Sequence, residues 1–281
     1  MLAARPATEG TMNQRQWIPM DESAAPNLAR IKKLEWLITA VGTLLFLAIG
    51  LLVGQPLLAV LGLIVFGAFS WSIGRNAEAS VLSAVSITPA NEIDHARLFN
   101  VVEGLRLSSG DHRPAMYTMS SSFPVAFAVS EPGSDGSIVV SNVFLETMDR
   151  VETEAVVAQL LFRIRSGDAA LMSYLVSFSA LMSRIGLGSI ARKVIERSTD
   201  ARSLIWADIA ACQATRYPPA LVSALEKCAA AHGPISVGIA APFCFALPET
   251  PSHDTHAVAT VPSVGFSRPS LAERIAVLKE I

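Results

Sequence analysis

The chain has 281 residues, enough for one sizeable domain with appended segments. Hydrophobic residues make up 51% of it and charged residues only 16%, which is too apolar for an ordinary soluble domain, so we expect membrane segments. The net charge of −2 comes from intermixed acidic and basic residues, and the absence of a strongly basic face argues against nucleic acid as a partner.

Two uncharged runs near the N-terminus predict a transmembrane helical hairpin. Residues 36–53 and 57–73 contain no charged side chain, and each approaches the roughly 20 residues that cross the hydrocarbon core of a bilayer. The sequence GQP at 54–56 is typical of a tight turn between them. We therefore assign residues 1–33 to a polar cytoplasmic N-terminal segment and residues 34–75 to the hairpin, whose partner is the lipid bilayer.

Basic residues flank the open end of this hairpin. Arg30, Lys32 and Lys33 precede the first run, Arg75 follows the second, and the connector carries no charge. Because positively charged flanks stay in the cytoplasm, both ends of the hairpin are expected there. The prediction is a multi-pass protein of a bacterial-type inner (cytoplasmic) membrane with its globular domain in the cytoplasm.

From residue 76 onward the composition is that of a globular domain. Apolar residues at helical spacing predict helices after Pro89 in residues 87–110, over residues 152–166 and over residues 200–231, the last interrupted by a pair of prolines. A terminal helix is expected over residues 270–281, with the serine that opens it as its cap.

Strands and loops are expected between these helices. The alternating pattern around Pro124 predicts two short strands, and SIVVSNVFLETM predicts a strand followed by a short helix. A third apolar run, residues 169–183, is too short to span a bilayer before Arg184 interrupts it. Residues 233–269 are rich in Pro, Gly and small residues and are expected to be mostly loop.

Five stretches, taken in order, resemble the HtpX-like membrane zinc metallopeptidases. They are ARLFNVVEGLRLSSG, PVAFAV, VSNVFLETMDRVETEAVVAQLLFRIRSGD, WADIAACQATRYPPALVSALEKC and SRPSLAERIAVLKEI. The resemblance covers most of residues 34–281 and is weakest over residues 230–262. It implies an α+β fold in which a zincin-like metallopeptidase domain, residues 76–281, follows the N-terminal two-helix transmembrane hairpin.

The resemblance also implies that the metal-binding residues of the family are replaced here. In the family, two histidines one helical turn apart bind zinc, and a glutamate between them acts as general base. Gln159 and Arg163 stand at the histidine positions, Leu160 at the glutamate position, Leu204 at the third ligand and Arg268 at a C-terminal histidine. A guanidinium offers no lone pair to a metal, and leucine can neither ligate nor take a proton. We therefore expect no catalytic residue at these positions, no bound metal and no zinc cofactor.

Arg163 suggests what holds the site together instead. By the resemblance, it lies on the helix face that carries the zinc-binding histidines in the family, and Asp208 comes from the segment that would face the metal. Asp168 matches an aspartate that follows the family motif. We expect a charge-assisted contact between Arg163 and Asp208, joined by Gln159, to link two helices in place of the metal. The alternative is that Arg163 is a tolerated substitution on a partly exposed face.

These substitutions predict a pseudo-peptidase that is not an enzyme. It would be a catalytically inactive, membrane-anchored binding, adaptor or structural subunit with a protein partner in a membrane complex. The stretch FPVAFAVS, with Phe123, Val125 and Phe127, is the expected edge strand for an extended peptide or a partner's strand.

Two alternatives remain open. An active HtpX-like membrane metalloendopeptidase in membrane-protein quality control would need a non-standard metal site, for which His253 and His256 form a close pair without a third ligand nearby. A purely structural subunit would have its groove filled by its own residues 233–267. That alternative predicts no open cleft above Gln159 and Arg163.

Overall fold

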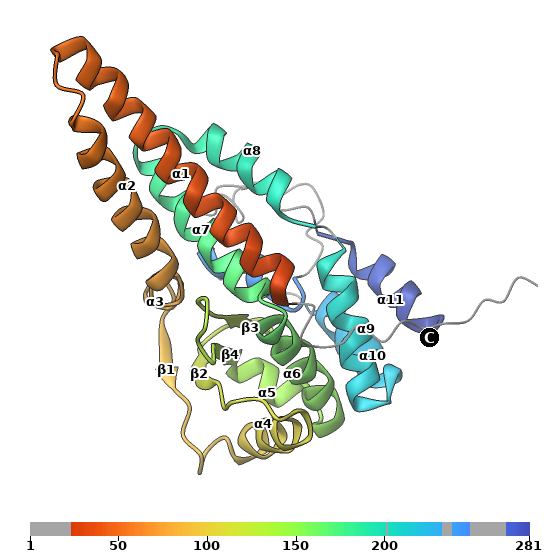
Figure 1. Ribbon diagram of the computed structural model, residues 1–281. Coiled ribbons are helices and arrows are strands. Elements are labelled where there is room, and N and C mark those ends of the chain that lie inside the picture. The colour runs from red at the N-terminus through yellow and green to blue at the C-terminus, as the bar shows by residue number, and fades with distance from the viewer. Residues whose placement is uncertain (1–23, 201, 232–237, 248–267) are drawn as a thin grey trace, which may run out of the picture.

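The computed structural model describes residues 24–200, 202–231, 238–247 and 268–281. A helical hairpin projects from a mostly helical body that holds a small mixed sheet (Figure 1). In chain order the elements are α1 (Ala24–Val53), α2 (Leu58–Arg75), α3 (Ala77–Ser83), β1 (Ile87–Pro89), α4 (Ala96–Ser109), β2 (Ala115–Met119), β3 (Ala126–Val129), β4 (Ser137–Ser141), α5 (Asn142–Thr147), α6 (Arg150–Arg165), α7 (Asp168–Arg184), α8 (Gly188–Ser198), α9 (Ser203–Thr215), α10 (Pro218–Ala230), the 3-10 helix η1 (Gly238–Phe243) and α11 (Leu271–Lys279).

The sheet has the strand order β1-β2-β4-β3. Strands β2 and β4 run parallel, and the outer strands β1 and β3 are each antiparallel to their neighbour. Every residue of β4 and of β3 is buried, although β3 lies at an edge of the sheet. A completely buried edge strand must be covered by another segment of the protein.

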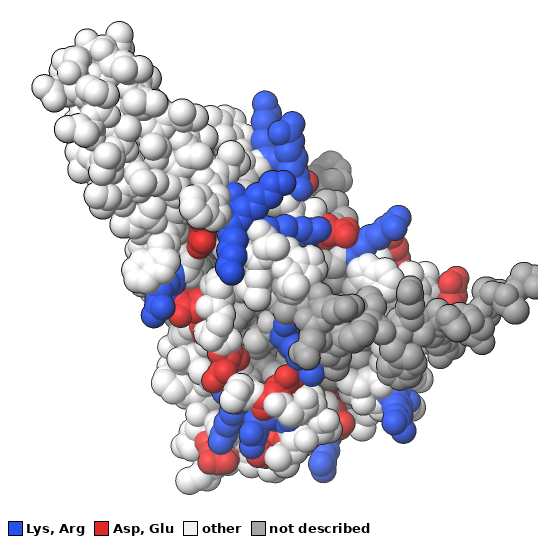
Figure 2. All heavy atoms as spheres, in the orientation of Figure 1, with Lys and Arg blue, Asp and Glu red and all other residues white. Residues whose placement is uncertain are grey.

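Helices α1 and α2 form the hairpin predicted from the two uncharged runs. Both are long and apolar enough to cross a membrane, and large apolar side chains on them are exposed, including Trp36 at 72% and Leu52 at 87%. The projecting part of the hairpin is free of charged residues (Figure 2). An apolar surface of this extent is costly in water, so the two helices support a membrane location.

The first turns of α1 belong to the body of the protein. The helix begins at Ala24, inside the segment expected to be a polar arm, because its apolar residues pack against α7. Ile31 is buried in a cluster with Leu171 of that helix. The Asn27 side-chain amide donates a hydrogen bond to the Ser166 carbonyl at the end of α6, with an N···O distance of 3.0 Å. The hairpin is therefore docked on the body at its base.

The third apolar run forms α7, which packs along α1, α2 and α3. Its Tyr174 hydroxyl lies 3.2 Å from the Ser70 hydroxyl of α2. Burial raises the pKa of Tyr174 to about 12, so the phenol is neutral and available as a hydrogen-bond donor. Helix α7 thus joins the hairpin to the helices that surround the sheet.

Two segments differ from the expected secondary structure. The helix predicted after Pro89 begins only at Ala96, and residues 87–89, for which no strand was expected, pair with β2 as strand β1. Residues 238–247, expected as loop, form η1 and then a β-bridge between Cys244 and Phe127. Both elements depend on pairing with a distant segment, which local sequence pattern does not report.

Two glycines of the hairpin form a matched test of its packing. A Cβ atom at Gly42 would overlap the Phe66 ring, whereas one at Gly67 would make an ordinary 3.8 Å contact with Thr39. We expect Gly42→Ala to lower the free energy of unfolding by about 1–3 kcal/mol through overpacking. Gly67→Ala is expected to leave it unchanged or slightly higher. Thermal melting of the full chain in detergent compares the two, and equal melting temperatures would contradict the close approach of α1 and α2.

Candidate functional site

Helix α6 carries the positions at the centre of the predicted site. It begins with a capping box, in which the Glu152 amide donates to the Asp149 carboxylate at 2.7 Å and the Asp149 amide donates to the Glu152 carboxylate at 2.8 Å. The Glu152 carboxylate also accepts from the Ser223 hydroxyl at 2.5 Å and from the Lys227 ammonium at 2.6 Å. Because Ser223 and Lys227 lie on α10, these bonds fix the start of α6 against that helix.

Arg163 is buried rather than partly exposed. Its side chain is 1% exposed, and its Nε donates to an Asp168 carboxylate oxygen at 2.8 Å. Its Nη1 donates to the Phe243 carbonyl at 2.6 Å. Gly167, with a φ of 69°, adopts the left-handed conformation that turns the chain from α6 into α7 and returns Asp168 to Arg163.

Asp208 is bound by Arg274 of α11. The Nε and Nη2 atoms of Arg274 donate to the two carboxylate oxygens, each at 2.7 Å, and its Nη1 donates to the Phe245 carbonyl at 2.6 Å. Gln159 approaches the same carboxylate, with its Nε2 atom 3.4 Å from Asp208 Oδ1. The site therefore holds two ion pairs, Arg163 with Asp168 and Arg274 with Asp208, in place of the single Arg163–Asp208 contact that we expected. The bidentate fork of Arg274 occupies both oxygens through which Asp208 would have met Arg163.

Arg268 adds a third guanidinium to this site. It donates to the carbonyls of Ala241, at 2.7 Å, and of Cys244. Within the described ranges it forms no ion pair, and burial lowers the pKa of its guanidinium to about 10, so it is still charged at neutral pH. We call the group formed by these side chains the arginine cluster; its members are Arg163, Arg268, Arg274, Asp168 and Asp208.

The side chains at this site do not fit a zinc ion. Zinc is held by thiolate, imidazole or carboxylate donors, and here both oxygens of Asp208 accept from Arg274. Leu160 and Leu204 are buried and have no donor atom. Gln159 Oε1 is buried without a hydrogen-bond partner among the described residues, and one neutral amide oxygen is a poor zinc site. In the part of the chain that the structure describes, no three His, Cys, Asp or Glu side chains come together as a metal site.

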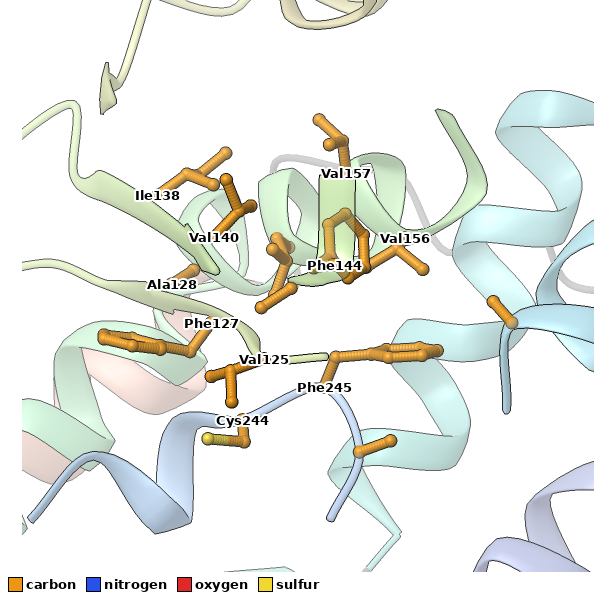
Figure 3. Packing of buried hydrophobic residues seen from close by; sticks show 14 of the residues in the cluster. Val125, Phe127, Ala128, Ile138, Val140, Phe144, Val156, Val157, Cys244 and Phe245 are labelled. Atoms are coloured by element: carbon orange, nitrogen blue, oxygen red, sulfur yellow. The ribbon is translucent and has the colours of Figure 1, made fainter. Parts of the chain in front are cut away.

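The edge strand expected to receive a peptide is covered by the chain itself. The Phe245 amide donates to the Ala126 carbonyl at 2.7 Å, and Cys244 forms a β-bridge with Phe127. Figure 3 shows Cys244 and Phe245 beside the strand. The three side chains predicted to form the open edge are consequently buried in the core; they are Phe123, Val125 and Phe127.

Arg274 is a residue of the site that we did not predict from the sequence. It lies three residues after Leu271 and four before Leu278, both of which are buried. An arginine on the apolar stripe of a helix is a signal for a buried, paired charge. His253 and His256, the metal candidates of the alternative prediction, lie outside the described residues.

Comparison with known proteins finds relatives with the name "Protease HtpX homolog". The relative from Thermoanaerobacter pseudethanolicus is 30% identical over 114 residues, which are 41% of this chain and 38% of its own length. The relative from Dictyoglomus thermophilum is 26% identical over 183 residues, 54% and 60% of the two chains. The relative from Acidiphilium cryptum is 29% identical over 185 residues, 66% and 62% of the two chains. The chain therefore spans about half the length of the curated relatives it matches. No family model and no solved structure matches it.

These names correct one expectation. We expected a chain that is not an enzyme, but its relatives are named proteases, so the similarity places it with an enzyme family. The expectation rested on substituted positions alone, and the comparisons do not connect those substitutions with a loss of activity; the positions are Gln159, Leu160, Arg163, Leu204 and Arg268.

Removing one or both partners of the Asp208–Arg274 pair tests what the pair contributes. Asp208→Leu leaves a buried guanidinium without its carboxylate, which we expect to lower the free energy of unfolding by about 3–5 kcal/mol. The double variant Asp208→Leu with Arg274→Met removes both buried charges and should recover most of that loss. Chemical denaturation of the full chain in detergent measures both values. Arg192→Ala, in an exposed pair on α8, is the control expected to change little. A double variant no more stable than the single one would show that the charges themselves stabilise the fold.

Proposed function

Because the chain is HtpX-like, we propose that it acts on polypeptide chains at the membrane surface, as a membrane-anchored relative of the HtpX proteases. The observation that carries this proposal is its similarity to proteins named as proteases over 41% to 66% of its length. The exposed apolar hairpin supports the anchoring. The proposed substrates are loosened or unfolded segments of membrane proteins, which is a role in membrane-protein quality control.

In this proposal both hairpin helices cross the membrane and the body lies on the cytoplasmic side. The basic residues at the open end of the hairpin support this orientation; they are Arg30, Lys32, Lys33 and Arg75. The body would be a zincin-like domain, which the order of the small sheet followed by α6 supports. A protein partner in a membrane complex, as predicted from the sequence, would meet this same cytoplasmic body.

The arginine cluster offers no hydrolytic step through zinc, because its side chains do not fit the metal. A metalloendopeptidase with a non-standard site would need ligands beyond the described residues, and His253 and His256 lie there. What the described site offers a polypeptide is a set of guanidinium N–H donors beside a strand edge. Such donors bind main-chain carbonyl oxygens.

The test compares one polypeptide in two states. The full chain in lipid nanodiscs is mixed with fluorescent α-lactalbumin, either native or reduced and unfolded, and binding is followed by fluorescence anisotropy. Parallel gels follow cleavage with and without a chelator, and the metal content of the protein is measured. We expect saturable binding of the unfolded form and none of the native form, because only an unfolded chain offers an extended main chain to the strand edge.

The outcomes separate the parts of the proposal. Cleavage that a chelator abolishes, together with bound metal, would establish the metallopeptidase activity. Binding of the unfolded form without cleavage would still support polypeptide recognition. The proposal fails if the nanodiscs neither bind nor cleave the unfolded form. Arg192→Ala, an exposed change on α8, is expected to behave as the unchanged protein.

A further inference from the structure

Residues 238–247, called the strap from here on, lie along the outer edge of β3. After η1 the chain extends, Cys244 bridges to Phe127, and the Phe245 amide donates to the Ala126 carbonyl at 2.7 Å. Figure 3 shows Cys244 and Phe245 beside Phe127 of β3 and Val125, the residue that precedes the strand. This is the arrangement that a peptide adopts when it adds to the edge of a sheet.

Three guanidinium groups hold the strap through its main chain. Each donates to one or two strap carbonyls; the contacts are Arg163 to Phe243, Arg268 to Ala241 and Cys244, and Arg274 to Phe245. The carbonyls of Ala241 and Phe243 lie in the last turn of η1, and that of Cys244 lies just beyond it. The last carbonyls of a helix have no partners within the helix. These hydrogen bonds go to main-chain oxygens, which every polypeptide has, while Phe243, Cys244 and Phe245 also bury their side chains in the core. Another extended polypeptide could therefore receive the same hydrogen bonds.

The charges of the arginine cluster favour a particular kind of polypeptide. The cluster holds three guanidinium groups and two carboxylates, and Asp168 and Asp208 are taken by Arg163 and Arg274. Arg268 meets neutral carbonyls of the strap instead of a carboxylate within the described ranges. A hydrogen bond to an ionised acceptor is roughly twice as strong as one between neutral groups. A segment that brought a carboxylate to Arg268 would therefore form a stronger hydrogen bond with it than the neutral carbonyls of the strap do.

We propose that the edge of β3 and the arginine cluster form a binding site for an extended polypeptide with an acidic side chain, and that the strap occupies this site until such a segment displaces it. The identity of the ligand as a polypeptide rests on the proposed function. The release of the strap does not rest on that function, because only contacts within this chain hold the strap in place.

The reactivity of Cys244 can report whether the strap is bound to β3 or released. Its thiol is fully buried, and burial raises its pKa to about 12, so a seated strap protects it from thiol reagents, which attack the thiolate. Cys212 on α9 is also buried with a pKa raised to about 12, but it lies outside the strap. The rate of alkylation at Cys244 relative to Cys212, read by mass spectrometry of the full chain in detergent, thus measures strap release.

The first experiment loosens the strap without any ligand. Arg268→Ala removes donors to two strap carbonyls, and we expect Cys244 to react roughly tenfold faster or more, since hydrogen bonds from a charged donor are stronger than those between neutral groups. Cys212 should react at its original rate, and the exposed control Arg192→Ala should change neither. Unchanged protection of Cys244 would overturn the proposal. An equal rise at both cysteines would overturn it too, because Arg268 would then support the whole fold.

The second experiment adds peptides to the unchanged protein. Acetylated and amidated nonapeptides have the sequence of residues 239–247, with Ala in place of Cys244 and Asp, Asn or Lys in place of Pro242, the residue after Ala241. Blocked ends leave the side chain as the source of charge. We expect the Asp peptide to accelerate alkylation of Cys244 at the lowest concentration, the Asn peptide at a higher one and the Lys peptide least. Equal effects of the Asp and Lys peptides, or no effect of any, would overturn the proposal.

The two experiments also separate this inference from the proposed function. If Arg268→Ala releases the strap but nanodiscs bind no unfolded polypeptide, the proposed function fails while the strap contact is real. If the nanodiscs bind unfolded polypeptide while Cys244 stays protected throughout, the polypeptide binds elsewhere and this inference fails alone.

Discussion

The buried ion pair between Asp208 and Arg274 is the interaction on which the rest of the site depends. Both side chains are 1% exposed, and two hydrogen bonds of 2.7 Å join them. Moving two charges out of water is costly unless their remaining hydrogen-bonding groups are also satisfied. Here the third nitrogen of Arg274 binds the Phe245 carbonyl, and the guanidinium carbon lies 5.0 Å from the centre of the Phe245 ring. The pair thereby joins α9 to α11 and fixes the end of the strap.

The arginine cluster shares one electrostatic property with a metal site but has the opposite hydrogen-bonding and ligand chemistry. A zinc ion and a guanidinium group are both cations that attract carbonyl oxygens of a polypeptide. Zinc, however, needs electron-pair donors from the protein, whereas Arg163 and Arg274 need acceptors, and Asp168 and Asp208 supply them. The described part of this HtpX-like chain therefore buries positive charge beside β3, and these side chains do not form a zinc site.

The parts of the fold that the sequence predicted are those set by local pattern. Helices α6, α9, α10 and α11 follow from apolar periodicity and from caps, and the two prolines in the first turn of α10 mark its start. Strand β1 was missed because it exists only through pairing with β2. The strap was expected as loop because its small residues have no period, and its structure comes from contacts with β3 and three arginines.

The same distinction explains the site. The family resemblance suggested that Arg163 lies on the ligand face, but the partner expected for it, Asp208, was not the one found, because Asp168 of α7 pairs with Arg163 instead. Arg274 lies 66 residues from Asp208 in the chain, and no local pattern joins the two. The burial of Phe127 had the same cause, since the segment that covers it is far along the chain.

Under the proposed membrane location, the docking of α1 on the body also sets a distance between the end of α6 and the bilayer. The hydrogen bond from Asn27 to Ser166 places the end of α6 beside the start of α1. With Trp36 at the edge of the bilayer, the helix between them rises about 14 Å at 1.5 Å per residue. An extended chain covers that gap with about four residues at 3.3 Å each. Membrane proteins whose spans are joined by tight turns cannot bridge this gap, whereas those with long loops, free tails or a span drawn out of the bilayer can. Under the proposed function, the length of this part of α1 would select the chains that can reach the body.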